Sequence, residues 1–221
     1  FIQRLSEAVC PAPPAEVLDL GCGSGRHVRS FESMGYRAHG IDLSPASIAK
    51  AQRLAAHPER FAVADMRDFA VTENLTHRFD VITSLFTSFG YFDKWTDQIR
   101  TLQHVRRALR PGGTFVLDFL NTPHVAAHLV PHEVAQRPTP EGGSMTFEIH
   151  RRIEAGWIEK SIAYTDGQGQ ERHYVERVRA LSSGDLEALL AEADLTVSQR
   201  FGDYGLGAHT EASNRCIVVA S

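Results

Sequence analysis

Short apolar segments that alternate with helical segments constrain the fold of this chain more than any other feature of its sequence. Apolar runs with the length of buried strands occur at residues 16–20, 37–41, 61–64, 79–84 and 114–118. Alternation of this kind favours a parallel sheet with helices on both faces. We therefore expect an α/β protein with a doubly wound, Rossmann-like sheet.

Caps and turn residues mark the expected helices. Ser44 and Pro45 suit the cap and the first position of one helix. Ser182 and Asp185 form a capping box before another. Together with the apolar spacing, these signals predict helices over residues 26–34, 45–54, 94–109 and 185–193.

The pattern changes after Asn121 and becomes typical of antiparallel strands. Apolar and polar residues alternate over 145–149, and further extended runs cover 157–164 and 173–181. Glycine-containing turns separate these runs, so we expect an insertion of two or three antiparallel strands.

The insertion divides the expected core into two parts. Strands predicted at 195–201 and 215–220 return the chain to the doubly wound sheet. We therefore assign residues 1–121 and 182–221 to the core. Residues 122–181 form the antiparallel insertion, which leaves the core at the ligand-binding edge of the sheet, and we expect it to act as a substrate lid.

Composition narrows the range of partners. The 221 residues carry a formal net charge of −4 with both signs interspersed, so we expect no nucleic-acid partner and a small-molecule substrate instead. The three cysteines are far apart and lack metal-ligand spacing, which favours reduced thiols and a cytoplasmic protein. No apolar run approaches the roughly 20 residues that cross a bilayer, so we expect no membrane partner.

A glycine-rich loop follows the first predicted strand. Gly21, Gly23 and Gly25 allow the backbone to approach a ligand closely and to adopt positive φ. The third glycine comes one residue too early for the dinucleotide fingerprint, because position 26 is Arg26, and this disfavours a pyrophosphate site. A tight turn without a ligand is the alternative interpretation.

Acidic residues follow the next two strands. Asp42 can accept hydrogen bonds from both hydroxyls of a ribose, and Asp65 can accept one from an adenine amino group. Met66 can add an apolar wall or a backbone donor. The alternatives are a helix-capping role for Asp42 and roles as a turn residue and a core side chain for Asp65 and Met66.

These segments together resemble the class I S-adenosylmethionine-dependent methyltransferases. VLDLGCGSGRH at residues 17–27 resembles their first motif, and residues 40–44 and 64–69 are similar to the ribose-binding and adenine-side motifs. The turn at 109–114 is also typical of that fold. The resemblance implies a seven-stranded sheet whose last strand, 215–220, is antiparallel to the others.

The same resemblance implies a cofactor and its contacts. The cofactor would be S-adenosyl-L-methionine, and the product S-adenosyl-L-homocysteine. The glycines would line the methionine moiety, Asp19 would anchor its amino group, and Leu43 would flank the adenine. The full set of implied cofactor residues is Asp19, Gly21, Cys22, Gly23, Gly25, Asp42, Leu43, Asp65, Met66 and Ser84.

A finer likeness concerns the acceptor. Residues 65–69 and 86–91 resemble small-molecule N-methyltransferases, including enzymes acting on amino sugars and, more distantly, glycine and sarcosine methyltransferases. We therefore expect a small-molecule acceptor methylated at an amine nitrogen, with Tyr91 as the candidate catalytic residue that orients it. The predicted acceptor pocket consists of Phe86, Ser88, Tyr91 and Tyr204. A core aromatic cluster and, around Tyr204, a surface turn are the alternatives.

Three further interpretations stay open. His124, His128 and His132 are four residues apart, as metal ligands on one helix face would be, but Pro123 and Pro131 interrupt that helix. We expect a solvated face there and no metal site. An adenosylmethionine-binding protein without methylating chemistry is an alternative function, and a NAD-dependent oxidoreductase is a weaker one.

Overall fold

The computed structural model describes residues 1–72, 75–138 and 143–221. The helices are α1 (Ile2–Val9), α2 (Arg26–Ser33), α3 (Pro45–Leu54), α4 (Phe69–Thr72), α5 (Trp95–Ala108), α6 (Thr122–Ala127) and α7 (Ser183–Ala191), with a 3₁₀ turn at Pro58–Arg60. The strands are β1 (Glu16–Leu20), β2 (Arg37–Asp42), β3 (Phe61–Val63), β4 (Phe79–Ser84), β5 (Leu109–Leu120), β6 (His132–Pro138), β7 (Ser144–Glu154), β8 (Trp157–Thr165), β9 (Glu171–Arg179), β10 (Val197–Phe201) and β11 (Arg215–Ala220). No helix within the described ranges combines the length and apolarity that a membrane span requires.

Seven strands form the main sheet in the order β10-β11-β5-β4-β1-β2-β3. Strands β1 to β5 run parallel to one another, and β11 pairs antiparallel with both β5 and β10. The doubly wound α/β sheet, its seven strands and its antiparallel last strand are thus confirmed. The order changes direction between β1 and β4, so the carboxyl ends of these two strands border the crevice where such sheets bind ligands.

Helices bury both faces of this sheet. Leu18 and Leu20 of β1 belong to a core cluster that also contains residues of α5 and α7. Val17 of the same strand points to the opposite face and packs in a second cluster with residues of α1, α2 and α3. Because successive side chains of a strand alternate between faces, strands buried on both faces are apolar at nearly every position, as the sequence showed.

The helix caps form as the sequence predicts. The Ser44 hydroxyl accepts a hydrogen bond from the backbone N–H of Ser47, with Pro45 in the first turn of α3. Ser182 and Asp185 form both hydrogen bonds of the capping box that starts α7. Each cap satisfies backbone N–H groups that have no partner within the helix and so stabilises the first turn.

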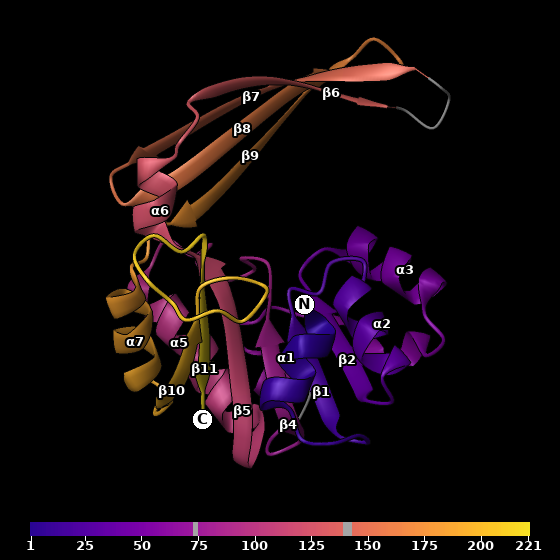
Figure 1. The fold of residues 1–221 in the computed structure, drawn as a ribbon. Coiled ribbons are helices and arrows are strands. Elements are labelled where there is room, and N and C mark those ends of the chain that lie inside the picture. The colour runs from indigo at the N-terminus through magenta and orange to yellow at the C-terminus, as the bar shows by residue number, and fades with distance from the viewer. Residues whose placement is uncertain (73–74, 139–142) are drawn as a thin grey trace.

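The insertion is a four-stranded antiparallel sheet in the order β6-β7-β8-β9, one strand more than the upper end of our prediction. The strand that sequence reasoning missed is β6, in which only Ala135 is buried. An edge strand with so little apolar burial lacks the alternation that marks a half-buried strand. The sheet rises above the carboxyl ends of the core strands, where β9 runs down to the core and β6 lies far from it (Figure 1).

The four-stranded sheet attaches to the core at one end. Ile158 of β8 and Val178 of β9 are buried in the same apolar cluster as the core strands. The backbone N–H of Arg179 donates a hydrogen bond of 2.8 Å to the carbonyl of Gly90, in the loop after β4. The remainder of β9, from Glu171 to Arg177, is exposed. The loop after β4 therefore lies directly beneath the insertion.

Candidate active site

The glycine loop forms a tight turn at the carboxyl end of β1. The backbone N–H groups of Gly21 and Cys22 both donate to the carbonyl of Ile41 at 2.9 Å. Gly21, Gly23 and Gly25 all have positive φ, between 54° and 76°. A Cβ on Gly21 would lie 2.6 Å from Cβ of Ser88, so only glycine fits there.

Asp42 holds this loop and the start of α3 together. Its Oδ2 accepts a 2.8 Å hydrogen bond from the N–H of Gly23, and its Oδ1 accepts one of 2.8 Å from the N–H of Ser44. Each carboxylate oxygen has a second lone pair, so a fixed Asp42 can still accept two hydroxyl hydrogen bonds.

A cavity of about 410 Å³ opens beside Asp42. Five of the predicted cofactor residues line it, together with three of the predicted acceptor-pocket residues. Its lining consists of Gly21, Ile41, Asp42, Leu43, Ala64, Asp65, Met66, Phe86, Thr87, Ser88, Tyr91 and Phe92. The structure thus brings together residues from the ends of β1, β2, β3 and β4, as a switch-point site requires.

Asp19 and Ser84 lie deeper, at the ends of β1 and β4. Asp19 is 1% exposed; its Oδ1 accepts a 2.8 Å hydrogen bond from the Thr83 hydroxyl. Its Oδ2 has no hydrogen-bond partner among the described residues and lies 3.6 Å from Nδ1 of His27. A buried carboxylate oxygen without a donor is costly. Neither Asp19 nor Ser84 lines the cavity, and a contact of either residue with a cofactor stays a prediction.

Two further residues of the glycine loop, Cys22 and Gly25, lie outside the cavity. Cys22 is buried, and burial together with Asp19 and Asp42 raises the pKa of its thiol, so the sulfur stays protonated. Gly25 caps α2 in the left-handed region. Neither Cys22 nor Gly25 lines the cavity, and any contact they make with a cofactor stays a prediction.

Asp65 is engaged by a residue that sequence reasoning missed. Arg67 donates to both carboxylate oxygens of Asp65, the shortest contact being 2.6 Å from Nη2 to Oδ2. These hydrogen bonds hold the pKa of Asp65 below its usual value. Asp65 lines the cavity as a fixed anion, and its hydrogen bond to adenine stays a prediction.

A second cavity, of about 580 Å³, adjoins the first beneath the four-stranded sheet. The two share Phe86, Thr87 and Tyr91, which come from the loop after β4. The other lining residues are Leu120, Val125, Leu129, Arg151, Ile158, Glu159, Lys160, Glu176, Arg177, Val178 and Arg215. The predicted pocket residues Phe86 and Tyr91 therefore lie between two spaces, one at the glycine loop and one under the insertion.

The walls of the second cavity carry paired charges. Arg151 lies 2.8 Å from a carboxylate oxygen of Glu133, and Lys160 lies 3.2 Å from one of Glu176. Sequence reasoning missed these residues because nothing in the local sequence distinguishes them from other surface charges. Antiparallel pairing of β6 to β9 places them in one wall.

Tyr91 is half-exposed at the junction of the cavities. Partial burial and the nearby carboxylate of Glu176 raise the pKa of Tyr91 above its usual value. The phenol is therefore protonated at neutral pH and can both donate and accept one hydrogen bond. That state suits a residue that orients a substrate better than one that removes its proton.

The loop that carries Phe86 is strained and held by a buried carboxylate. Phe86 and Thr87 both have positive φ, 58° and 64°, which is rare for residues other than glycine. Oδ2 of Asp118 accepts a 2.8 Å hydrogen bond from the N–H of Phe86, and the Asp118 carbonyl accepts one from Thr87. Arg215 pairs with Asp118 at 2.6 Å. Sequence reasoning missed Asp118 and Arg215.

Two predicted pocket residues have other surroundings. The Ser88 hydroxyl lines the first cavity but donates to the carbonyls of Gly21 and Leu85. Tyr204 donates to Oδ2 of Asp118 at 3.2 Å and lines a third hollow, near the N-terminus, which shares Phe86 with the two cavities described above. A role for either side chain toward the acceptor stays a prediction.

The three evenly spaced histidines do not share a helix face. Helix α6 ends at Ala127, and the rings of His124 and His128 stack at 4.1 Å around its end. His132 lies beyond Pro131, in strand β6, and is therefore not part of helix α6.

Comparison with known proteins agrees with this geometry. Residues 17–113 match the family described as the methyltransferase domain. The chain contains a methyltransferase domain. The matched segment runs from β1 to the turn region of β5 and includes the glycine loop and Asp42.

Two curated relatives illustrate the similarity. The chain is 31% identical over 106 residues to the dTDP-4-amino-2,3,4,6-tetradeoxy-D-glucose N,N-dimethyltransferase of Saccharopolyspora spinosa, covering 46% of this chain and 39% of that one. It is 25% identical over 219 residues to the cypemycin N-terminal methyltransferase of a Streptomyces species, covering 95% and 84%. For the relative from Saccharopolyspora spinosa and for a putative methyltransferase of Bacillus subtilis, the chain thus spans only about two fifths of their length.

Solved structures show the same fold. A methyltransferase of Streptomyces caelestis superposes with a TM-score of 0.79 at 19% identity, over 99% of this chain and 87% of that one. A sugar N-methyltransferase of Streptoalloteichus superposes with a TM-score of 0.77 at 22% identity, over 99% and 83%. The resemblance to class I S-adenosylmethionine-dependent methyltransferases is confirmed at the level of the fold and of the methyltransferase domain.

Proposed function

We propose that this chain transfers the methyl group of S-adenosylmethionine to an amine nitrogen of a small molecule. One observation carries the proposal: a cavity at the glycine loop and Asp42 meets a second cavity beneath the four-stranded sheet, and Phe86, Thr87 and Tyr91 line both. Methyl transfer needs a donor site and an acceptor site that meet at one point.

The residues of the first cavity and those behind it fit the cofactor. The buried Oδ2 of Asp19, which has no hydrogen-bond partner among the described residues, suits the cationic amino group of the methionine moiety. Asp42 has acceptor capacity for two ribose hydroxyls, and Leu43 and Met66 offer apolar surface for adenine. When bound, S-adenosylmethionine supplies a methyl group already activated by a positively charged sulfur.

The chain's own residues then have to align the acceptor and exclude water. In the displacement, the nitrogen lone pair forms the new C–N bond while the C–S bond breaks and its electron pair stays on sulfur. The product amine must lose one proton, and the neighbouring groups able to accept it are Glu176 and solvent. Tyr91, protonated at neutral pH, orients the nitrogen by hydrogen bonding.

Several features support an amine rather than an oxygen or carbon acceptor. The relatives of known name include three that methylate amino groups of dTDP-sugars, besides the cypemycin enzyme. The second cavity also includes Glu176, whose carboxylate lies near Tyr91 and can accept a hydrogen bond from an amine N–H. Ubiquinone O-methyltransferases are also similar to this chain, so the isolated product has to identify the methylated atom.

We further propose that residues 122–181 act as a lid that selects the acceptor. Residues of β7, β8 and β9 line one wall of the second cavity, whereas the wall of the first comes from the core and its loops. On this division, residues 1–121 and 182–221 bind the cofactor. The acceptor identity depends on the inner face of the insertion.

Two measurements test the proposal in sequence. Calorimetry with S-adenosylhomocysteine should show one site per chain, and the absence of binding would refute the cofactor assignment. Incubation of small-molecule amines with methyl-labelled S-adenosylmethionine should then give N-methylated product, at a rate that rises with pH and levels off as the amine becomes neutral. A product methylated at oxygen or carbon would overturn the amine assignment.

A further inference from the structure

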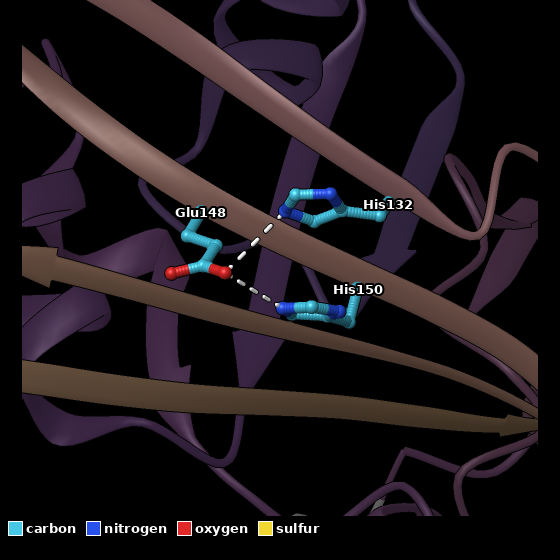
Figure 2. A group of neighbouring side chains, drawn as sticks. All are labelled: His132, Glu148 and His150. Atoms are coloured by element: carbon cyan, nitrogen blue, oxygen red, sulfur yellow. Dashed lines mark hydrogen bonds and ion pairs between the residues drawn. The ribbon is translucent and has the colours of Figure 1, made fainter.

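A cluster of three side chains lies on the four-stranded sheet and includes none of the residues that line the two cavities. Nε2 of His150 lies 3.1 Å from Oε1 of Glu148, and Nε2 of His132 lies 3.4 Å from the same oxygen. Figure 2 shows the two rings one above the other, both directed at the carboxylate. The cluster joins β6 to β7.

The pairing register of these strands creates the cluster. His132 is the direct cross-strand partner of His150 in the antiparallel ladder. Glu148 comes two residues before His150 on the same strand and therefore points to the same face. The imidazole rings stack at 4.6 Å between centroids, with an angle of 21° between their planes.

None of the three cluster residues lines the acceptor cavity. Arg151 lines the cavity, and its neighbour His150 must point to the opposite face because side chains alternate along a strand. The side chains of His132, Glu148 and His150 are between 51% and 56% exposed. The cluster is thus accessible from solvent and forms no part of the proposed active site.

We propose that His132, Glu148 and His150 bind a divalent transition-metal ion, with Zn²⁺ the best match. Their ligand atoms all lie within 4.8 Å of one another. Donors at about 2.0–2.1 Å from one tetrahedral ion are roughly 3.3–3.4 Å apart, so small rotations of exposed side chains bring all three into range. Two imidazole nitrogens and a carboxylate oxygen suit Zn²⁺, whereas Mg²⁺ and Ca²⁺ prefer oxygen ligands alone.

Three protein ligands leave one position of a tetrahedral ion for water. The ion would bind at the edge strand of the sheet. Strand β6 has β7 as its one neighbour in this sheet and buries little apolar surface. A metal ion held by His132 from β6 and by two ligands from β7 cross-links the two strands, and its binding stabilises the paired state over the open one. The sequence led us to expect no metal, because it offered three histidines on a helix rather than this trio.

Titration of the full chain, freed of any affinity tag and stripped of metal, tests the site. Calorimetry should show one Zn²⁺ per chain bound more tightly than Mg²⁺, and His150→Ala and Glu148→Gln should each weaken Zn²⁺ binding by roughly tenfold or more. His173→Ala is the matched control, since His173 is an exposed histidine beside Glu171 on β9 and should leave binding unchanged.

Hydrogen exchange adds a readout specific to the cross-link. Zn²⁺ should slow amide exchange in residues 132–138 of the unmodified chain and leave it unchanged in His150→Ala. Circular dichroism checks that the variants fold. No measurable Zn²⁺ binding, or a Zn²⁺ affinity that His150→Ala leaves intact and His124→Ala removes, would overturn the proposal.

Discussion

The two sheets of this protein are stabilised in different ways. In the seven-stranded sheet, β1 and β11 bury every residue but the first of each strand, whereas β9 of the four-stranded sheet buries only Val178. The first sheet gains its stability from apolar burial on both faces. The second depends on its hydrogen-bond ladder, on cross-strand pairs such as Lys160 with Glu176, and on its attachment to the core at one end.

The proposed cofactor site and the proposed acceptor site therefore belong to sheets that are stabilised differently. The cofactor residues follow strands whose positions are held by a packed core, so their geometry is set before any ligand arrives. The acceptor wall belongs to a sheet with little burial, and regions of that kind open and change more readily. The following experiments test whether the core binds the cofactor and the four-stranded sheet binds the acceptor.

Removing the lid should have the largest effect. Replacement of residues 132–179 by a short glycine-serine linker takes away the β7–β9 wall of the second cavity, and methyl transfer should fall below detection. Affinity for S-adenosylhomocysteine should stay within about threefold, because the first cavity is built from the core and its loops. Circular dichroism controls for folding, and substantial turnover in the shortened chain would refute the separation.

Asp42→Ala tests the core side of the comparison. The substitution removes an acceptor that is charged, and losing hydrogen bonds to such a group costs about 1.5–3 kcal/mol, or roughly 10- to 150-fold in the dissociation constant of S-adenosylhomocysteine. Calorimetry measures this change. Glu187→Ala, which removes an exposed carboxylate paired with Arg200, is the control and should bind normally. Normal binding by Asp42→Ala would mean that the ribose lies elsewhere.

Gly90→Ala tests the contact between the two regions. Gly90 has a φ of +93°, and an added Cβ would lie 2.8 Å from Val178 and 2.9 Å from Phe119. Overpacking at such a junction costs about 1–3 kcal/mol in the free energy of unfolding, beyond the backbone strain.

Gly112→Ala separates the cost of backbone strain from the cost of overpacking. Gly112 also has a positive φ, +78°, but an added Cβ would meet no atom within 4 Å, so this variant carries the backbone strain alone. Urea denaturation measures the free energy of unfolding of both variants. Equal losses in Gly90→Ala and Gly112→Ala would show that β9 is not packed tightly against the loop after β4.

Tyr91→Phe should have the smallest effect and addresses the point where the two cavities meet. If the hydroxyl orients the acceptor, turnover should fall by roughly tenfold, equivalent to about 1.4 kcal/mol, with unchanged affinity for S-adenosylhomocysteine. Tyr174→Phe removes the hydroxyl of an exposed tyrosine on β9 and is the matched control. Full activity in Tyr91→Phe would assign Tyr91 to packing alone.

Much of the core was predictable because its signals are local. The apolar runs of β1, β2 and β4, the glycines of the loop and the cap at Ser182 each report the conformation of their own segment. Parallel strands then bring their carboxyl ends to one edge of the sheet, so the order of motifs along the chain was enough to predict the cavity beside Asp42.

The supporting contacts could not be predicted from the sequence because each depends on where the fold places the two side chains. Arg215 and Asp118 are 97 residues apart, and their pairing exists only because β11 lies next to β5. Arg67 comes two residues after Asp65 in the sequence, but only the fold shows that it donates to both carboxylate oxygens. Sequence spacing alone did not predict either partner.

The histidines show the difference between what the sequence determines and what the tertiary structure decides. The sequence by itself determined the doubly wound core, its glycine loop and the place where an insertion begins, because burial and backbone conformation leave local patterns in the chain. Whether His132 stands beside His128 or His150 depended on where α6 ends and on the register of β6 against β7. A register is a relation between two strands, and a shift of one residue would turn His132 to the opposite face and dissolve the cluster.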